Sequence, residues 1–321
     1  METHDCVLES AAEVGIMETG SKMIFPEVFS MADKNTVVTI RNDRLTVAVK
    51  ALGAEMTSVK TAGGTERLWQ GDPAWWSGQA PLLFPVAGSF KDDEYILNNK
   101  TYHMPKHGFA KYRVFDVEAQ DEDSVTFLLA GENARHEGFP FDYELRVRYA
   151  LEENRIKIDY TIANLGDSPL YACIGAHEAY ACPDGVDSYE IAFDEDEGGY
   201  VANSLFERGC LSRKRENIAL QNNALPLHAA DFEGTTLTFL TLKSRGVTLR
   251  RRTGERIAHV DYAGFNYLLL WTIPGAGYIC IEPWSNHPDF IDTNKQLPAK
   301  PGVIPVAAHD SALRSHTLTI Y

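Results

Sequence analysis

The stretch that decides the fold is Leu145-Arg-Val-Arg-Tyr-Ala-Leu-Glu-Glu-Asn-Arg-Ile-Lys-Ile-Asp-Tyr160. Apolar and polar residues alternate through both halves, which is the period-two pattern of strands with one buried face. The residues between the halves, Glu152–Asn154, are polar and suit a turn. The stretch therefore predicts two antiparallel strands in a sheet that has one solvated side.

Similar alternating runs recur along the chain, and long segments with a helical period are absent. The runs lie at Val37–Thr39, Leu45–Val49, Ser124–Leu129, Tyr143–Ala150, Arg155–Ile162, Thr235–Leu242, Val247–Arg252, Tyr267–Thr272, Tyr278–Ile281 and Leu313–Tyr321. This pattern disfavours folds that alternate strands with helices. We expect an all-β protein, with one large antiparallel β-sandwich over residues 36–321. Residues 1–35 are expected to form an N-terminal extension, of which Met23–Phe29 packs on the body.

Composition excludes several classes of function. The chain has 321 residues, 30 basic and 45 acidic, and a formal charge of −15. Such a charge argues against binding to nucleic acid or to anionic membranes, and no apolar run reaches the ~18 residues of a membrane span. Five scattered cysteines without a C-x-x-C pair indicate reduced thiols in a cytoplasmic protein. The N-terminal residues lack the pattern of a signal peptide.

Two histidines stand in unusual surroundings. His107 lies in Met104-Pro-Lys-His-Gly-Phe-Ala110, where a loop held by proline and glycine can present its ring to a ligand. His177 follows two small residues in Ile174-Gly-Ala-His and can give or take a proton near neutral pH. The alternatives are a half-buried loop histidine and a hydrogen-bonded core histidine. Glu178 would face the opposite side of a strand from His177, so it is not expected to be its proton partner.

A third segment, Tyr278-Ile-Cys-Ile-Glu-Pro-Trp284, places a carboxylate at the end of an apolar strand. Burying Glu282 there costs free energy unless the group is paired or used, and burial can raise its pKa into the range of a general base. Trp284 suits either the face of a sugar or the core. His177, His107 and Glu282 lack the short spacings of a metal site. A second carboxylate acting with Glu282 in a glycosidase remains an open alternative.

The order of these motifs is more specific than any one of them. It runs F-P-x-x-G at Phe84, M-P-x-H-G-F-A at Met104, G-A-H-x-A at Gly175, L-K-S at Leu242 and C-I-E-P-W at Cys280. This order resembles the aldose 1-epimerase (galactose mutarotase-like) family, and within it the LacX-like branch. The similarity covers about residues 36–321.

The resemblance implies a galactose mutarotase-like supersandwich that binds a small-molecule sugar across a concave face. It implies interconversion of the α and β anomers of a hexose in carbohydrate metabolism, with no cofactor and no metal, by a monomer or homodimer. In the family's pattern Glu282 falls on the base and His177 on the acid. His107 falls on a substrate hydrogen-bonding position, and Lys243 of the L-K-S motif is also assigned to the substrate.

Several positions depart from the family's pattern. Ser89 stands where an arginine is usual, and we expect Ser89 itself to contact the substrate. Lys91 or Lys106 is a candidate replacement for the missing cation. Thr235 meets the position of a sugar-binding aspartate, and Glu178 replaces a proline.

These departures keep two alternative functions open. One is a carbohydrate-binding or regulatory protein without turnover, which the serine at position 89 favours. The other is a hexose-6-phosphate 1-epimerase. Arg250–Arg252 could supply positive charge for a phosphate, although alternate residues of a strand face opposite sides and a solvated edge explains them equally well. The charge of −15 makes phosphosugars less natural substrates unless a local basic pocket exists.

Overall fold

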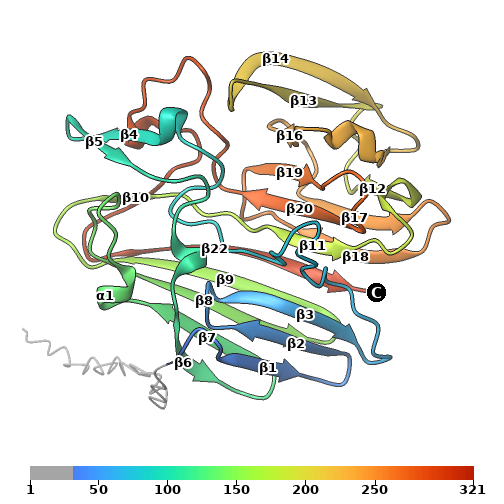
Figure 1. Cartoon of the computed structure of the whole chain (residues 1–321), viewed down its shortest axis with the longest axis horizontal. Coiled ribbons are helices and arrows are strands. Elements are labelled where there is room, and N and C mark those ends of the chain that lie inside the picture. Colours follow the sequence, from blue (N-terminus) through green and yellow to red (C-terminus); the bar gives the residue numbers. More distant parts are fainter. Residues whose placement is uncertain (1–31) are drawn as a thin grey trace, which may run out of the picture.

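Two large antiparallel sheets dominate the computed structural model, which describes residues 32–321 (Figure 1). Cys6, Met23–Phe29 and almost all of the predicted extension lie outside the described residues. The larger sheet has nine strands, in the spatial order β15 (Ala224–Pro226), β12 (Tyr189–Phe193), β17 (Gly246–Arg251), β18 (Arg256–Asp261), β22 (Ser311–Ile320), β9 (Arg155–Asn164), β8 (Tyr143–Glu152), β7 (Ser124–Leu129) and β6 (Asp116–Gln120). The second has six, in the order β11 (Glu178–Ala181), β20 (Tyr278–Trp284), β19 (Tyr267–Trp271), β16 (Leu237–Phe239), β13 (Tyr200–Glu207) and β14 (Cys210–Ala219).

Smaller elements complete the chain. A three-stranded sheet contains β1 (Val37–Arg41), β2 (Leu45–Lys50) and β3 (Glu55–Thr61), and two-stranded sheets pair β4 (Glu94–Leu97) with β5 (Lys100–His103) and β10 (Leu170–Ala172) with β21 (Ile304–Val306). In the described residues, helical structure is limited to α1 (Gly131–Ala134) and the short 3-10 turns η1 (Lys91–Asp93), η2 (Ala110–Tyr112), η3 (Val186–Ser188), η4 (Ala229–Phe232) and η5 (Leu297–Ala299). No helix in residues 32–321 is long and apolar enough to cross a membrane.

The predicted hairpin at residues 145–160 is confirmed as β8 and β9, which pair antiparallel from Glu152↔Arg155 outward. Glu153 lies in the turn with a φ of +53°. Burial alternates along both strands, because one face covers the core and the other faces solvent. The all-β sandwich that the sequence predicted is therefore the observed fold.

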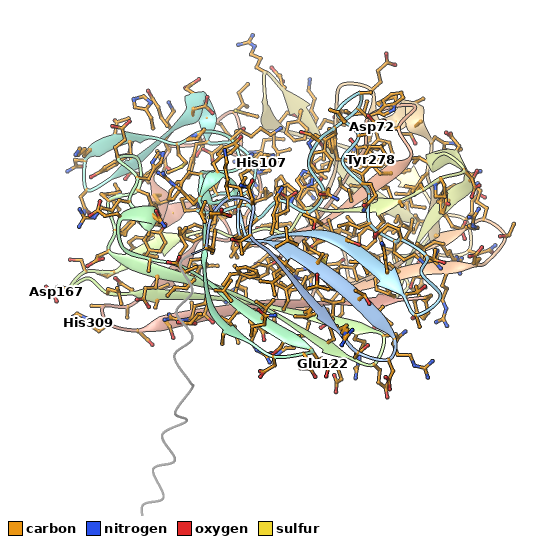
Figure 2. All side chains as sticks on the ribbon, turned by 60° about the horizontal axis from the view of Figure 1, so that its bottom comes forward. Asp72, His107, Glu122, Asp167, Tyr278 and His309 are labelled. Carbon is orange, nitrogen blue, oxygen red and sulfur yellow. The ribbon has the colours of Figure 1, made fainter. Side chains whose placement is uncertain are left out.

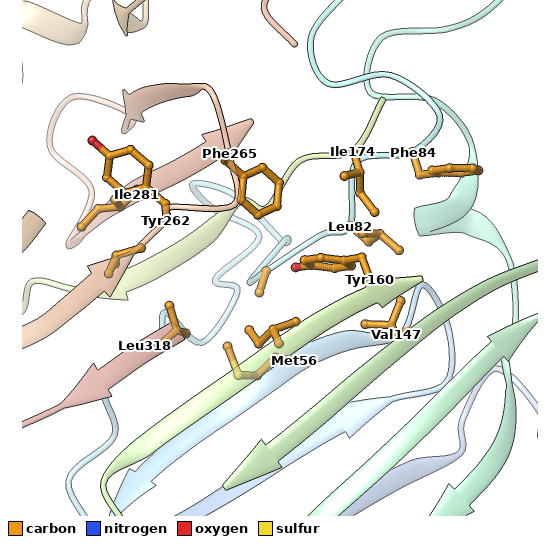
Figure 3. Close-up of a cluster of buried hydrophobic side chains, with 14 of the residues drawn as sticks. Met56, Leu82, Phe84, Val147, Tyr160, Ile174, Tyr262, Phe265, Ile281 and Leu318 are labelled. Atoms are coloured by element: carbon orange, nitrogen blue, oxygen red, sulfur yellow. The ribbon is translucent and has the colours of Figure 1, made fainter. Parts of the chain in front are cut away.

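The core forms where the small sheet and both large sheets meet. Met56 of β3, Tyr160 of β9, Ile281 of β20 and Leu318 of β22 belong to one buried apolar cluster (Figure 3). The four cysteines of the described part, Cys173, Cys182, Cys210 and Cys280, are buried and free, as expected from their scattered positions.

Two strand predictions differ from the structure. The expected strand Thr235–Leu242 shrinks to β16, and its first residues lie in a loop after η4. The strand expected to end at Glu282 continues to Trp284. Proline has no backbone N–H to donate to a neighbouring strand. Pro283 is tolerated because it faces the edge of β20 where β11 has already ended, and there its carbonyl accepts the N–H of Ala176.

Candidate active site

A cavity of about 890 Å³ opens beside the six-stranded sheet and is lined by segments from far apart in the sequence. Strands β19 and β20 supply one wall, and the loops around residues 76–89, 104–112 and 234–236 supply much of the rest, together with His177 and residues of the three-stranded sheet. His107, which lines the cavity, lies on the same side of the molecule as Asp72 and Tyr278 and away from Glu122 (Figure 2).

Strand register sets which side chains reach this cavity. Leu269 of β19 pairs directly with Glu282 of β20, and both line the cavity. Trp271 and Trp284 lie two residues further along their strands, and they line the same cavity. Since residues i and i+2 of a strand share a face, the sheet places all four side chains on one surface.

His177 and Glu282 meet within the cavity. Nε2 of His177 lies 3.3 Å from Oε2 of Glu282, and their side chains are 9% and 2% exposed. Burial raises the pKa of Glu282 well above its ordinary value, although Lys106 opposes this shift. Burial lowers the pKa of His177 to about 3. Each residue is thus shifted toward its neutral form, so the pair favours a carboxylic acid beside a neutral imidazole over two ions.

His107 is held in place by a reciprocal contact with Gly88. The backbone N–H of Gly88 donates to the ring Nδ1 of His107 at 3.0 Å, and the backbone N–H of His107 donates to the Gly88 carbonyl at 2.8 Å. His107 has a φ of +67°, an uncommon value for a side-chain-bearing residue. Burial first, and then His177, Lys106 and Lys111, hold its pKa well below its ordinary value. Because Nδ1 accepts, the proton of the neutral ring lies on Nε2.

Tryptophans surround the histidine–glutamate pair. The ring of Trp76 lies 5.1 Å from that of His177, the ring of Trp271 lies 5.8 Å from it, and the two tryptophan rings lie 5.3 Å from each other. Trp284 contacts His107 edge-on at 5.5 Å, and its Nε1 donates to the Ala176 carbonyl. These rings cover part of the pair and present apolar faces of the kind against which a pyranose can pack.

Glu178 lies outside this arrangement. Its carboxylate contacts Nε2 of the buried His316 at 3.0 Å, on the far side of β11 from the cavity. The sequence-based exclusion of Glu178 as the proton partner of His177 agrees with this geometry.

The predicted substrate-binding residues divide into two groups. His107, Ser89 and Trp284 line the cavity, as do Lys106 and Thr235. Lys91 and Lys243 do not. Nζ of Lys91 donates to the Ile291 carbonyl at 2.7 Å, and Nζ of Lys243 donates to the Asp196 carbonyl at 2.7 Å. Both lysines are thus drawn to backbone oxygens outside the cavity, and we withdraw them as sugar ligands.

The lining residues that sequence reasoning missed include Lys50, Glu55, Trp76, Lys111 and Trp271. Trp271 carried a usable signal, because it shares the alternating face of the Tyr267–Thr272 run. The others lie on a neighbouring sheet or in loops, where only the tertiary fold brings them to the cavity.

One group in residues 32–321 has the donors and spacing of a metal site. Nitrogen, sulfur and oxygen atoms of His177, Cys280 and Glu282 lie within 4.8 Å of one another. This mixed donor set suits a metal such as zinc. Burial and the carboxylates of Glu282 and Glu178 raise the pKa of the Cys280 thiol well above its ordinary value, so the thiolate that would bind a metal is disfavoured.

Comparison with known proteins places the chain in a family. The family model described as aldose 1-epimerase matches residues 36–297. The chain belongs to the aldose 1-epimerase family. It is 34% identical over 295 residues to the plasmid-encoded protein LacX of Lactococcus lactis subsp. lactis, covering 88% of this chain and 99% of that protein.

Solved structures agree with this aldose 1-epimerase assignment. A galactose mutarotase related enzyme from Lactobacillus acidophilus matches with a TM-score of 0.81 and 27% identity, over 89% of this chain and 97% of the other. A galactose mutarotase-like protein from Lactobacillus casei matches with a TM-score of 0.81 and 25% identity, over 89% and 100%. The family and fold support a carbohydrate-related, mutarotase-like function.

Proposed function

We propose that this protein is an aldose 1-epimerase that interconverts the α and β anomers of a sugar by acid–base catalysis. The observation that carries the proposal is the 3.3 Å contact between His177 and Glu282 inside a cavity of about 890 Å³. A cavity of this size is in the range of small-molecule sites. The two groups are the acid and base that the reaction needs.

Ring opening requires one proton acceptor and one proton donor. Glu282 takes the proton of the C1 hydroxyl, the C1–O5 bond breaks as the C1 carbonyl forms, and His177 gives a proton to O5. After rotation about the C1–C2 bond, O5 adds to the other face of the carbonyl and both protons return. The cycle therefore needs a His177–Glu282 pair that holds one titratable proton.

The reaction needs Glu282 as a carboxylate and His177 as an imidazolium, but burial disfavours both charged forms. Because burial raises the pKa of Glu282 and lowers that of His177, the proton of the pair favours Glu282 before a sugar binds. Moving that proton across the 3.3 Å contact produces the carboxylate and the imidazolium. A sugar whose hydroxyls replace water around the pair stabilises that arrangement through hydrogen bonds to the two charges.

His107 and the tryptophans position the sugar for this exchange. The Nε2–H of neutral His107 is a donor for a hydroxyl or for O5, and the Gly88 contact fixes its direction. Trp76 and Trp271 restrict water around His177. Each positioned acid or base typically contributes about 10²–10⁴-fold to a rate, which is ample for a reaction that already proceeds in water.

The direct test is the rate of anomer exchange, measured by exchange NMR on the anomeric protons of a panel of aldoses. The proposal predicts acceleration of at least one sugar by catalytic amounts of protein. Saturable sugar binding without acceleration of any sugar would instead support a carbohydrate-binding protein. The replacement of the family's arginine by Ser89 keeps that second function in view.

A further inference from the structure

Among the charged side chains that line the cavity, lysines outnumber acidic residues, whereas acidic residues are in excess over the whole chain. The charged lining residues are Lys50, Glu55, Lys106, Lys111 and Glu282. The protein as a whole carries a formal charge of −15. Solubility does not require a positively charged cavity, so the cluster of lysines in an acidic protein indicates a specific role.

Lys50 and Glu55 neutralise each other. Nζ of Lys50 lies 2.6 Å from Oε2 of Glu55. The other oxygen of Glu55 accepts the backbone N–H groups of Gln79 and Ala80 at 2.8 and 3.0 Å. Glu55 is therefore fully engaged in holding Lys50 and the loop after Trp76, and it forms no contact with another lysine.

Lys106 and Lys111 remain without an anionic partner. Within residues 32–321 neither forms an ion pair, although both line the cavity beside the catalytic pair. Glu282, the other lining carboxyl, is paired with His177. The cavity consequently holds two ammonium groups that form no ion pair with the described part of the chain, although Glu55 acts on Lys111 from a distance and opposes the lowering of its pKa by burial.

The loop that carries these lysines is fixed by backbone contacts. Gly53 N–H donates to the Arg113 carbonyl at 2.7 Å, and Gly53 has a φ of +75°. A Cβ at position 53 would lie 2.9 Å from the Lys111 carbonyl oxygen, so only glycine lets the loop approach this closely. Lys106 directly precedes His107, whose ring is held by Gly88. Both ammonium groups are thus attached to an ordered part of the wall.

We propose that the sugar taken by this cavity carries an anionic substituent, which Lys106 and Lys111 bind while its anomeric carbon lies at Glu282 and His177. This inference rests on the proposed epimerase function and names its substrate class. A phosphate ester and a carboxylate are the two sources of such an anion.

The arginines that the sequence offered for this role are engaged elsewhere. Arg250 pairs with Glu190 at 2.7 Å, and Arg251 pairs with Glu255 at 2.9 Å and also with Asp184. Arg252 donates to the Leu227 carbonyl. None of the three lines the cavity, so the local basic pocket that a phosphosugar requires is provided by lysines of another segment.

The test compares kcat/KM for glucose, galactose, their 6-phosphates and glucuronate by exchange NMR. We expect the preferred anionic sugar to exceed its neutral counterpart by about 10- to 100-fold, the range of a charge-assisted hydrogen bond. Lys106→Met and Lys111→Met each lower this ratio about tenfold or more. Lys60→Met, which removes an exposed lysine of β3 outside the cavity, leaves the ratio unchanged.

The outcomes separate this inference from the proposed function. A larger gain for the 6-phosphates than for glucuronate assigns a phosphosugar, and the reverse assigns a uronate. Equal or better turnover of neutral sugars would overturn the inference while leaving the epimerase function intact. If no sugar is turned over, the function fails, and the calorimetric affinities of glucose 6-phosphate and of glucuronate, each compared with that of glucose, still decide the preference for an anion. Equal affinities for all three sugars would overturn it.

Discussion

Replacing Glu282 by glutamine removes the proposed base with the smallest change of shape. The side chain is 2% exposed, lies 3.3 Å from His177 Nε2, and faces Leu269 across the strand pair. Glutamine fills the same volume but cannot accept the C1 proton. Loss of one positioned base is expected to lower kcat by about 10²- to 10⁴-fold, equivalent to about 3–5 kcal/mol in the activation free energy. Because burial already disfavours the carboxylate, the amide is expected to leave the melting temperature nearly unchanged.

The matched control is Glu178→Gln. Glu178 is also buried, and its strand β11 pairs with β20, but its carboxylate is bound to His316 and not to His177. This variant is expected to lower the melting temperature, since it breaks a buried pair, while retaining anomer exchange. Exchange NMR and thermal unfolding on both variants give the comparison. If Glu282→Gln retains wild-type kcat, or if only Glu178→Gln loses it, the assignment of Glu282 as the base is refuted.

Three further predictions use the same assay. Because the His177–Glu282 pair must hold one proton, kcat/KM falls as pH rises through the pKa at which the pair loses that proton. Lys106 lowers the pKa of Glu282, so Lys106→Met is expected to move this fall to higher pH. A move to lower pH would contradict the assignment. His107→Phe removes the Nε2–H donor and lowers kcat/KM about 10- to 100-fold; unchanged kinetics would show that His107 makes no sugar contact. EDTA and Cys280→Ala leave kcat unchanged, whereas loss of activity that zinc restores would point to a metal at His177, Cys280 and Glu282.

The sequence predicted most of the fold because strands have a simple period. The alternating run at Leu145–Tyr160 predicted the two strands β8 and β9 and the turn between them, although Glu152, which was expected in the turn, pairs with Arg155. The short strand β15 was missed and β16 was predicted too long, because three residues are too few to show an alternation.

The candidate site was less accessible to sequence reasoning. His107, His177 and Glu282 carried local signals in the form of glycine, proline and small neighbours, and the fold brings them to one cavity. Lys111 and Lys50 carried none, since each is an ordinary lysine until tertiary structure places it. Lys91 and Lys243 were assigned by position along the chain, but their ammonium groups are bound to the carbonyls of Ile291 and Asp196. Which backbone oxygen a long flexible side chain meets depends on residues remote in sequence.

A double-mutant cycle tests the central claim most directly, because that claim is that His177 and Glu282 act as one acid–base unit. The kcat of anomer exchange would be measured for the wild type, His177→Gln, Glu282→Gln and the double variant. We expect each single substitution to lower kcat nearly as much as both together, since either one breaks the transfer of the shared proton. Independent effects that multiply in the double variant would contradict it.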